Sequence, residues 1–208
     1  YPVYICLTKQ ASPQRGDFPA VSEVINVLRQ NMINVTLITM GKVQKGFLTD
    51  GCNEYIKRLR AMCDFKLVEI EDEPLPEKNL NQTLIDKALE KESGKIISAI
   101  PKQSYVIAMC IEGKQLASRD FAKLFNQKAV EGYSSICLII GSSHGLSEKV
   151  KSRRDLRMSF SKMTFPHQLF RLMALEQIYR AFSINAGTKY HKYLIYFTVW
   201  IVNTPFLF

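Results

Sequence analysis

The sequence predicts an α/β fold in which a mostly parallel sheet carries helices on both faces. Apolar runs of strand length alternate with amphipathic, helix-like stretches from residue 32 onward, and no internal repeat or low-complexity linker interrupts this order. With 208 residues, 47% of them hydrophobic, the chain can bury one sizeable core but not two large ones. We therefore expect a single domain built from βα units.

The first half of this domain should contain two strands and two helices. Alternating apolar residues in 33–39 predict a strand, and apolar positions at helical spacing in 47–62 predict an amphipathic helix. Residues 65–71 form a second run of strand length. A loop rich in Glu and Pro follows, and we expect a long helix over 80–100.

The second half should contain the strands that are buried on both faces. Residues 105–111 and 135–140 are short, continuously apolar and rich in β-branched side chains, and residues 118–131 between them have a helical pattern. The last strand runs into I-G-S-S-H-G-L (140–146), which leads to a helix starting near Ser147. Glycines at such a place let the backbone bend around a ligand, although a purely structural turn has the same pattern.

The segment from Met158 onward concentrates polar side chains within an apolar frame. Pro166 cannot continue a strand but fits the first turn of a helix, so we expect a short strand, a tight loop and a helix over 167–184. Backbone N–H groups are free for a ligand where a loop enters a helix.

Charge and cysteine usage narrow the classes of function. Residues 1–31 carry three cations and two carboxylates and residues 193–208 carry no charge, so +8 of the net charge of +9 belongs to residues 32–192. Such a basic surface suits a polyanion partner. Five scattered cysteines without paired spacing argue against a metal site and against disulfides, and the missing G-x-G-x-x-G motif argues against NAD.

Three motifs together resemble one known family. S-F-S-K-M-T-F-P-H-Q (159–168), E-Q-I-Y-R-A (176–181) and Y-H-K (190–192) closely resemble the RlmH family of the SPOUT superfamily. The resemblance implies a Rossmann-like sheet with a C-terminal deep trefoil knot, and a homodimer. No signal peptide stands upstream of the core, so we expect the protein in the cytoplasm. The resemblance also implies methylation of N3 of a pseudouridine in 23S (large-subunit) ribosomal RNA, on the ribosome, with S-adenosyl-L-methionine as donor.

The resemblance assigns cofactor-binding roles to the strand ends and to the loop before Pro166. The implied residues are Met109, Gly141, Phe160, Ser161, Lys162, Met163, Thr164 and Phe165. By composition alone, the apolar members of this set could equally be core residues. The family usually has glycine where this chain has Ser142.

The implied catalytic residues are Arg180, His191, Tyr190 and His167. Loss of an imide proton near neutral pH requires a base or a cationic field, which histidine and arginine can supply, and a tyrosine ring can stack on a base. The alternatives are a surface ion pair of Glu176 with Arg180 and a frayed chain end.

We expect three segments: an N-terminal extension (1–31) outside the domain, the methyltransferase domain (32–192), and an apolar tail (193–208). The tail has sixteen residues, which is fewer than the roughly 20 that a membrane-spanning helix needs, and Pro205 interrupts it. Two other functions remain open. One is a SPOUT enzyme that modifies transfer RNA or another ribosomal base, and the other is a catalytically silent RNA-binding assembly factor.

Overall fold

The computed structural model describes residues 33–42, 46–76, 78–188 and 190. The expectations for residues 1–31, for His191 and for the tail 193–208 lie outside these residues and stay predictions.

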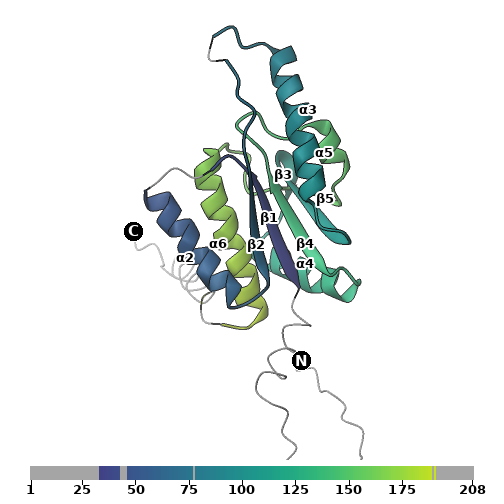
Figure 1. Ribbon diagram of the computed structural model, residues 1–208. Coiled ribbons are helices and arrows are strands. Elements are labelled where there is room, and N and C mark those ends of the chain that lie inside the picture. The colour runs from purple at the N-terminus through teal and green to yellow at the C-terminus, as the bar shows by residue number, and fades with distance from the viewer. Residues whose placement is uncertain (1–32, 43–45, 77, 189, 191–208) are drawn as a thin grey trace, which may run out of the picture. The chain divides into compact units, whose positions relative to one another are not determined.

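A five-stranded parallel sheet forms the centre of the described domain (Figure 1). Its strand order is β2-β1-β4-β3-β5. The strands are β1 (Asn34–Met40), β2 (Phe65–Ile70), β3 (Ser104–Gln115), β4 (Ser135–Ile140) and β5 (Leu156–Ser159). The predicted α/β class with a parallel sheet is confirmed. The knot stays a prediction, because strand order and pairing do not by themselves show how the chain threads.

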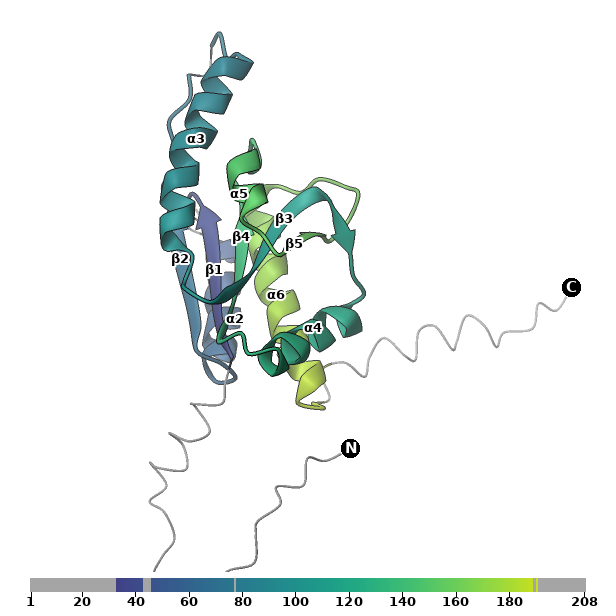
Figure 2. The ribbon, with the colours of Figure 1, turned by 90° about the vertical axis from the view of Figure 1, so that its right-hand side faces the viewer.

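Three helices pack on one face of the sheet and two on the other (Figures 1 and 2). The first group is α2 (Phe47–Arg60), α4 (Ser118–Val130) and α6 (His167–Asn185), and the second is α3 (Gln82–Ala99) and α5 (Glu148–Ser152). Leu59, Phe125 and Leu175 are buried in the larger core under the first group. Ile96 and Val150 are buried in the smaller core under the second.

The helix starts follow local capping chemistry. The Asn81 side chain accepts a hydrogen bond from the backbone N–H of Leu84 (2.9 Å), so α3 begins at Gln82 and not at residue 80 as predicted. Ser147 caps α5 in the same way, by accepting from the Val150 N–H (3.2 Å). Pro166 precedes the first residue of α6, as the sequence predicts.

Strand β3 is longer than predicted, because β5 pairs with it on both sides of an irregularity. The register of β3 against β5 shifts between Met109 and Lys114, which both pair with Met158. Gly113 lies in this stretch, and a Cβ atom there would lie only 2.5 to 2.8 Å from backbone atoms of Met158. The crossing of these two strands therefore requires a glycine at position 113.

A buried arginine ties α6 to the ends of two strands. Arg171 is 1% exposed. Its Nη1 donates to Glu69 Oε1 of β2 (2.5 Å), and its Nη2 donates to the carbonyl oxygens of Met40 (3.0 Å) and Gly41 (2.6 Å) at the end of β1. Because the guanidinium satisfies two carbonyl groups and a carboxylate at once, it fixes the first half of α6 over the sheet.

We expect Arg171→Met to lower the free energy of unfolding by about 3 kcal/mol, because the carbonyl groups of Met40 and Gly41 and the partly exposed Glu69 carboxylate lose their shared donor. The matched control is Lys42→Met, since Lys42 pairs with Glu71 (3.2 Å) where both side chains are mostly exposed. That variant should change the free energy by less than about 1 kcal/mol. Denaturant unfolding of both variants measures the difference, and equal effects would contradict a special role for Arg171.

Candidate functional site

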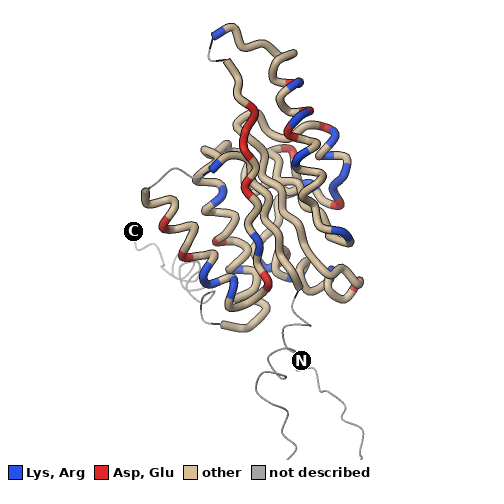
Figure 3. The backbone as a smooth tube through the Cα atoms, in the orientation of Figure 1, with Lys and Arg blue, Asp and Glu red and all other residues tan. Residues whose placement is uncertain are grey.

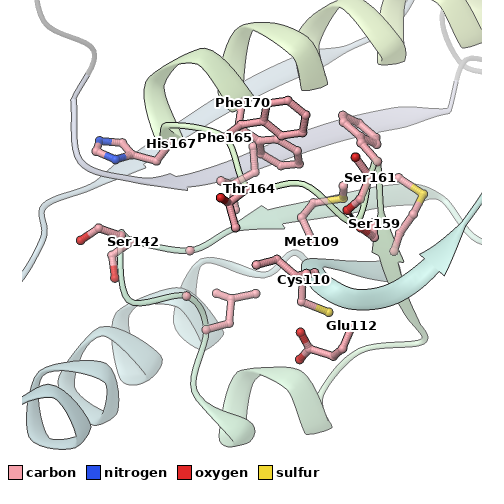
Figure 4. A pocket seen from close by; sticks show the side chains of 18 of the residues that line it. Met109, Cys110, Glu112, Ser142, Ser159, Ser161, Thr164, Phe165, His167 and Phe170 are labelled. Atoms are coloured by element: carbon pink, nitrogen blue, oxygen red, sulfur yellow. Dashed lines mark hydrogen bonds between the residues drawn. The ribbon is translucent and has the colours of Figure 1, made fainter. Parts of the chain in front are cut away.

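A pocket of about 530 Å³ lies at the carboxyl ends of β4 and β5 and beside the middle of β3 (Figure 4). Met109 of β3, Ile140 of β4 and Ser159 of β5 line its floor, and the loop before α6 closes it. Ligands of parallel α/β sheets bind at this edge. The volume lies within the range of roughly 300 to 1,000 Å³ that is usual for small-molecule sites.

The loop after β4 forms one wall through a tight backbone turn. The Gly145 N–H donates to the Ser142 carbonyl (2.9 Å), and these two residues also form an antiparallel bridge. A Cβ atom at position 141 would lie 2.2 Å from the Gly145 carbonyl oxygen and 3.0 Å from Leu146 Cγ. Gly141 therefore permits the turn itself, and any larger residue would push the loop out of place.

Ser142 ties this loop to helix α3 on the outer side. Its hydroxyl donates to Glu92 Oε2 (3.2 Å), and Glu92 Oε1 accepts the backbone N–H of Glu73 (3.1 Å). Glu92 is only 4% exposed. Ser142 thus makes a specific contact with a buried carboxylate, and this contact holds the loop in position.

Aromatic side chains and an ordered turn build the opposite wall. The rings of Phe160 and Phe170 lie 5.0 Å apart, and those of Phe165 and Phe170 lie 6.3 Å apart and nearly parallel. Within the loop, Ser159 Oγ donates to the Ser161 carbonyl (2.7 Å), and Ser161 Oγ accepts the Met163 N–H (3.0 Å). This wall combines flat apolar surfaces with backbone groups, as recognition of a heterocyclic ring requires.

One end of the pocket is charged. Lys151 Nζ lies 2.6 Å from Glu112 Oε1, and this hydrogen-bonded pair lowers the pKa of Glu112 and raises the pKa of Lys151. Both groups are therefore charged at neutral pH. Burial raises the pKa of the neighbouring Cys110 thiol, so it stays protonated at neutral pH. A protonated thiol is a poor nucleophile, which argues against a covalent cysteine mechanism.

The structure brings most of the predicted cofactor-binding residues to this pocket. The predicted residues that line it are Met109, Gly141, Phe160, Ser161, Met163, Thr164 and Phe165. Lys162 is exposed and does not line it. Glu112, Lys151 and Cys110 also line the pocket, and no motif in the sequence predicts this. Lys151 lies on α5, and nothing in the sequence indicates that this helix packs beside the end of β3.

The predicted catalytic residues separate into two places. His167 lies at the start of α6 and lines the pocket, at the same end as Ser142 in Figure 4. Arg180 follows thirteen residues later in the same helix, roughly 20 Å along its axis, and does not line the pocket. Tyr190 lies beside Arg180, and His191 is outside the described residues.

Arg180 and Tyr190 belong to an ordered cluster with Glu176, Tyr55 and Tyr179. Arg180 forms an ion pair with Glu176, and its guanidinium lies 4.9 Å from the centroid of the Tyr190 ring. The Tyr190 hydroxyl donates to Glu176 Oε1 (3.0 Å) and lies 3.2 Å from the Tyr55 hydroxyl. The predicted ion pair of Glu176 with Arg180 is present, and it is one part of this larger network.

Among the residues with described positions, no three His, Cys, Asp or Glu side chains are grouped so that they could hold a metal ion. No helix in that part of the chain combines the length and apolar character needed to span a bilayer.

Comparisons with known proteins identify relatives. The family described as "Predicted SPOUT methyltransferase" matches residues 33–191. Proteins named "Ribosomal RNA large subunit methyltransferase H" are 48% identical over 161 residues in Clostridium acetobutylicum and 47% identical over 160 residues in Clostridioides difficile. The one in Streptococcus thermophilus is 48% identical over 160 residues. Each match covers 77% of this chain and 100% of the relative.

The cluster around Tyr190 predicts an unusual alkaline titration. Burial, followed by the hydrogen bond with Tyr55 and the nearby Glu176 carboxylate, raises the pKa of Tyr190 above its ordinary value of 10.0. A raised folded-state pKa favours the neutral phenol, so this stabilisation is complete below about pH 10 and is lost as pH rises through the folded-state pKa. The measurement is the tyrosinate absorbance of the unmodified protein minus that of the Tyr190→Phe variant, followed as a function of pH. In the folded protein this difference should appear only well above pH 10.

In denaturant the same difference should titrate with the ordinary tyrosine pKa. A folded-state difference centred near pH 10 would contradict the network.

Proposed function

The chain belongs to the SPOUT methyltransferase family, and on that premise we propose that it transfers a methyl group from S-adenosylmethionine to large-subunit ribosomal RNA. The observation that carries this proposal is the convergence of Gly141, Met109 and the 160–165 loop on one pocket at the strand ends. Because the proposed substrate is the bacterial ribosome, we place the reaction in the cytoplasm.

The pocket suits S-adenosylmethionine in size and in the character of its walls. The apolar residues Met109, Leu146 and Phe165 offer surfaces for an adenine ring, and backbone groups of the two loops are available for its nitrogen atoms. The close turn at Gly141 lets the backbone form part of the wall without a side chain in the way. When bound, S-adenosylmethionine supplies an electrophilic methyl group on a positively charged sulfur.

The target that we propose is N3 of a pseudouridine. N3 carries an imide proton, which must leave so that the nitrogen can accept the methyl group. His167 lines the pocket and is a candidate to take this proton, because histidine changes protonation near neutral pH. Arg180 is a candidate to stabilise the resulting anion, and Tyr190 and His191 are candidates for stacking and proton transfer.

These groups can meet only if a second copy of the chain completes the site. In one chain, His167 and Arg180 lie about 20 Å apart along α6, and a single target base cannot contact both. We therefore propose a homodimer in which the Arg180–Tyr190 cluster of one subunit faces the pocket of the other. The existing ion pair with Glu176 would orient the arginine before the substrate arrives.

Cofactor binding can be tested with two matched glycine variants. Gly141→Ala places a methyl group against the Gly145 carbonyl and should weaken binding of S-adenosylmethionine at least roughly tenfold. Gly94→Ala is the control, since nothing lies within 4 Å of its Cβ position, and it should leave affinity unchanged and favour helix α3 by up to about 1 kcal/mol. Isothermal titration calorimetry measures the affinities. A folded Gly141→Ala protein with unchanged affinity would reject this pocket as the cofactor site.

The substrate can be tested by comparing whole ribosomes with protein-free ribosomal RNA. The described part of the chain holds one sheet with its helices and no second RNA-binding fold, so recognition should depend on the shape of the assembled particle. We expect efficient methyl transfer to ribosomes and poor transfer to stripped RNA. Mass spectrometry of digested RNA then locates the methyl group. Equal transfer to both substrates, or a methyl group on a base other than pseudouridine, would contradict the proposal.

A further inference from the structure

We infer that a basic segment, residues 149–157, binds the phosphate backbone of the RNA beside the pocket. The segment comprises most of helix α5, the following turn and the start of strand β5. This inference rests on the proposed function and adds to it the surface by which the substrate is held. The segment is well separated from the Arg180–Tyr190 cluster, because α5 and α6 lie on opposite faces of the sheet (Figure 1).

The segment concentrates positive charge within a short stretch of chain. It contains the five cations Lys149, Lys151, Arg153, Arg154 and Arg157, and Asp155 is its one carboxylate. Asp155 is directed to the protein, where Oδ2 accepts the Val106 N–H (2.7 Å). Figure 3 shows blue Lys and Arg positions in the region of α5, beside those of α3.

Carboxylates neutralise three of the five cations but leave two available. Lys149 pairs with Glu90 (2.5 Å), Lys151 pairs with Glu112 (2.6 Å), and Arg157 pairs with Glu148 (3.2 Å). Among the residues that the structure describes, neither Arg153 nor Arg154 has an ion-pair partner.

The two remaining arginines are arranged for a ligand outside the protein. Arg153 is exposed, and Arg154 is half-buried with its Nη1 donating to the carbonyl of Lys151. That contact orients the Arg154 guanidinium without neutralising its charge. Arginine presents several N–H donors in a plane, which matches the oxygen atoms of a phosphate.

The position of the segment relative to the pocket favours RNA as its ligand. Lys151 lines the pocket, and Arg153 and Arg154 follow two and three residues later. A nucleotide whose base enters the pocket must bring its flanking phosphates to the rim. Phosphate contacts fix the orientation of a nucleic acid and contribute affinity without reading its sequence.

The test uses the double variant Arg153→Gln/Arg154→Gln and the single variant Arg153→Gln, in which the Arg154 contact to α5 is kept. The matched control is Lys66→Gln/Lys102→Gln, which removes two exposed cations at the amino ends of β2 and β3, the edge of the sheet away from the pocket. The KM for ribosomes and kcat are measured by methyl transfer. Ribosome binding is measured by cosedimentation at several salt concentrations, and binding of S-adenosylmethionine by calorimetry.

We expect the Arg153→Gln/Arg154→Gln variant to raise the KM and Kd for ribosomes by roughly 10- to 30-fold near physiological salt, because about two phosphate contacts are lost. The slope of log Kd against log salt concentration should fall by about 1.4 to 1.8. The single variant should show about half of the slope change. Affinity for S-adenosylmethionine and kcat should be preserved. The control should change KM by less than about twofold, because distant exposed charges are screened.

Two outcomes would overturn the assignment of this surface. One is an α5 double variant that retains the ribosome affinity and salt slope of the unmodified protein, and the other is a control variant with an equal loss. Failure of the proposed function would look different, since the unmodified protein would then transfer no methyl group to ribosomes. Cosedimentation would in that case still decide whether α5 contacts the particle.

Discussion

The buried guanidinium of Arg171 holds together the two parts of the molecule on which the pocket depends. It joins helix α6 to the carboxyl ends of β1 and β2 through Glu69, Met40 and Gly41. His167 and Phe170 precede it in the same helix and line the pocket, so their positions follow from this anchor. A charged group in the core is costly unless its donors are satisfied, and here only its Nε lacks a partner among the described residues.

Two close backbone approaches then shape the cavity. At Gly113 the chain passes within contact distance of Met158, which brings β5 and the loop after it across the end of β3. At Gly141 the loop after β4 turns back on itself against Gly145. Both approaches exclude a Cβ atom, and both lie at the edge of the sheet where ligands bind. The pocket is therefore defined more by the path of the backbone than by individual polar side chains.

The sequence predicted the elements well because each has a strong local signal. The continuous apolar run of β4 was placed at its observed bounds, and Pro166 marked the start of α6. Contacts between distant segments carry no such signal. The extension of β3 to Gln115 depends on pairing with β5, and the contact of Ser142 with Glu92 joins residues fifty positions apart. Lys151 reaches the pocket for the same reason, since periodicity does not place α5 beside β3.

The separation of the predicted catalytic residues has a physical explanation in the geometry of α6. The motif at its start and the motif near its end are both polar, but an α-helix of nineteen residues is about 28 Å long and cannot direct its two ends to one small molecule. In the homodimer that we propose, the two motifs would share one substrate across the subunit boundary. His167 and the 160–165 loop would form one half-site, and Arg180 with Tyr190 would form the other. The cluster that orients Arg180 through Glu176 and Tyr190 is already assembled within a single chain, so association would bring together two preformed halves. Binding of the RNA would then cost little conformational entropy, because the side chains of both halves are already ordered.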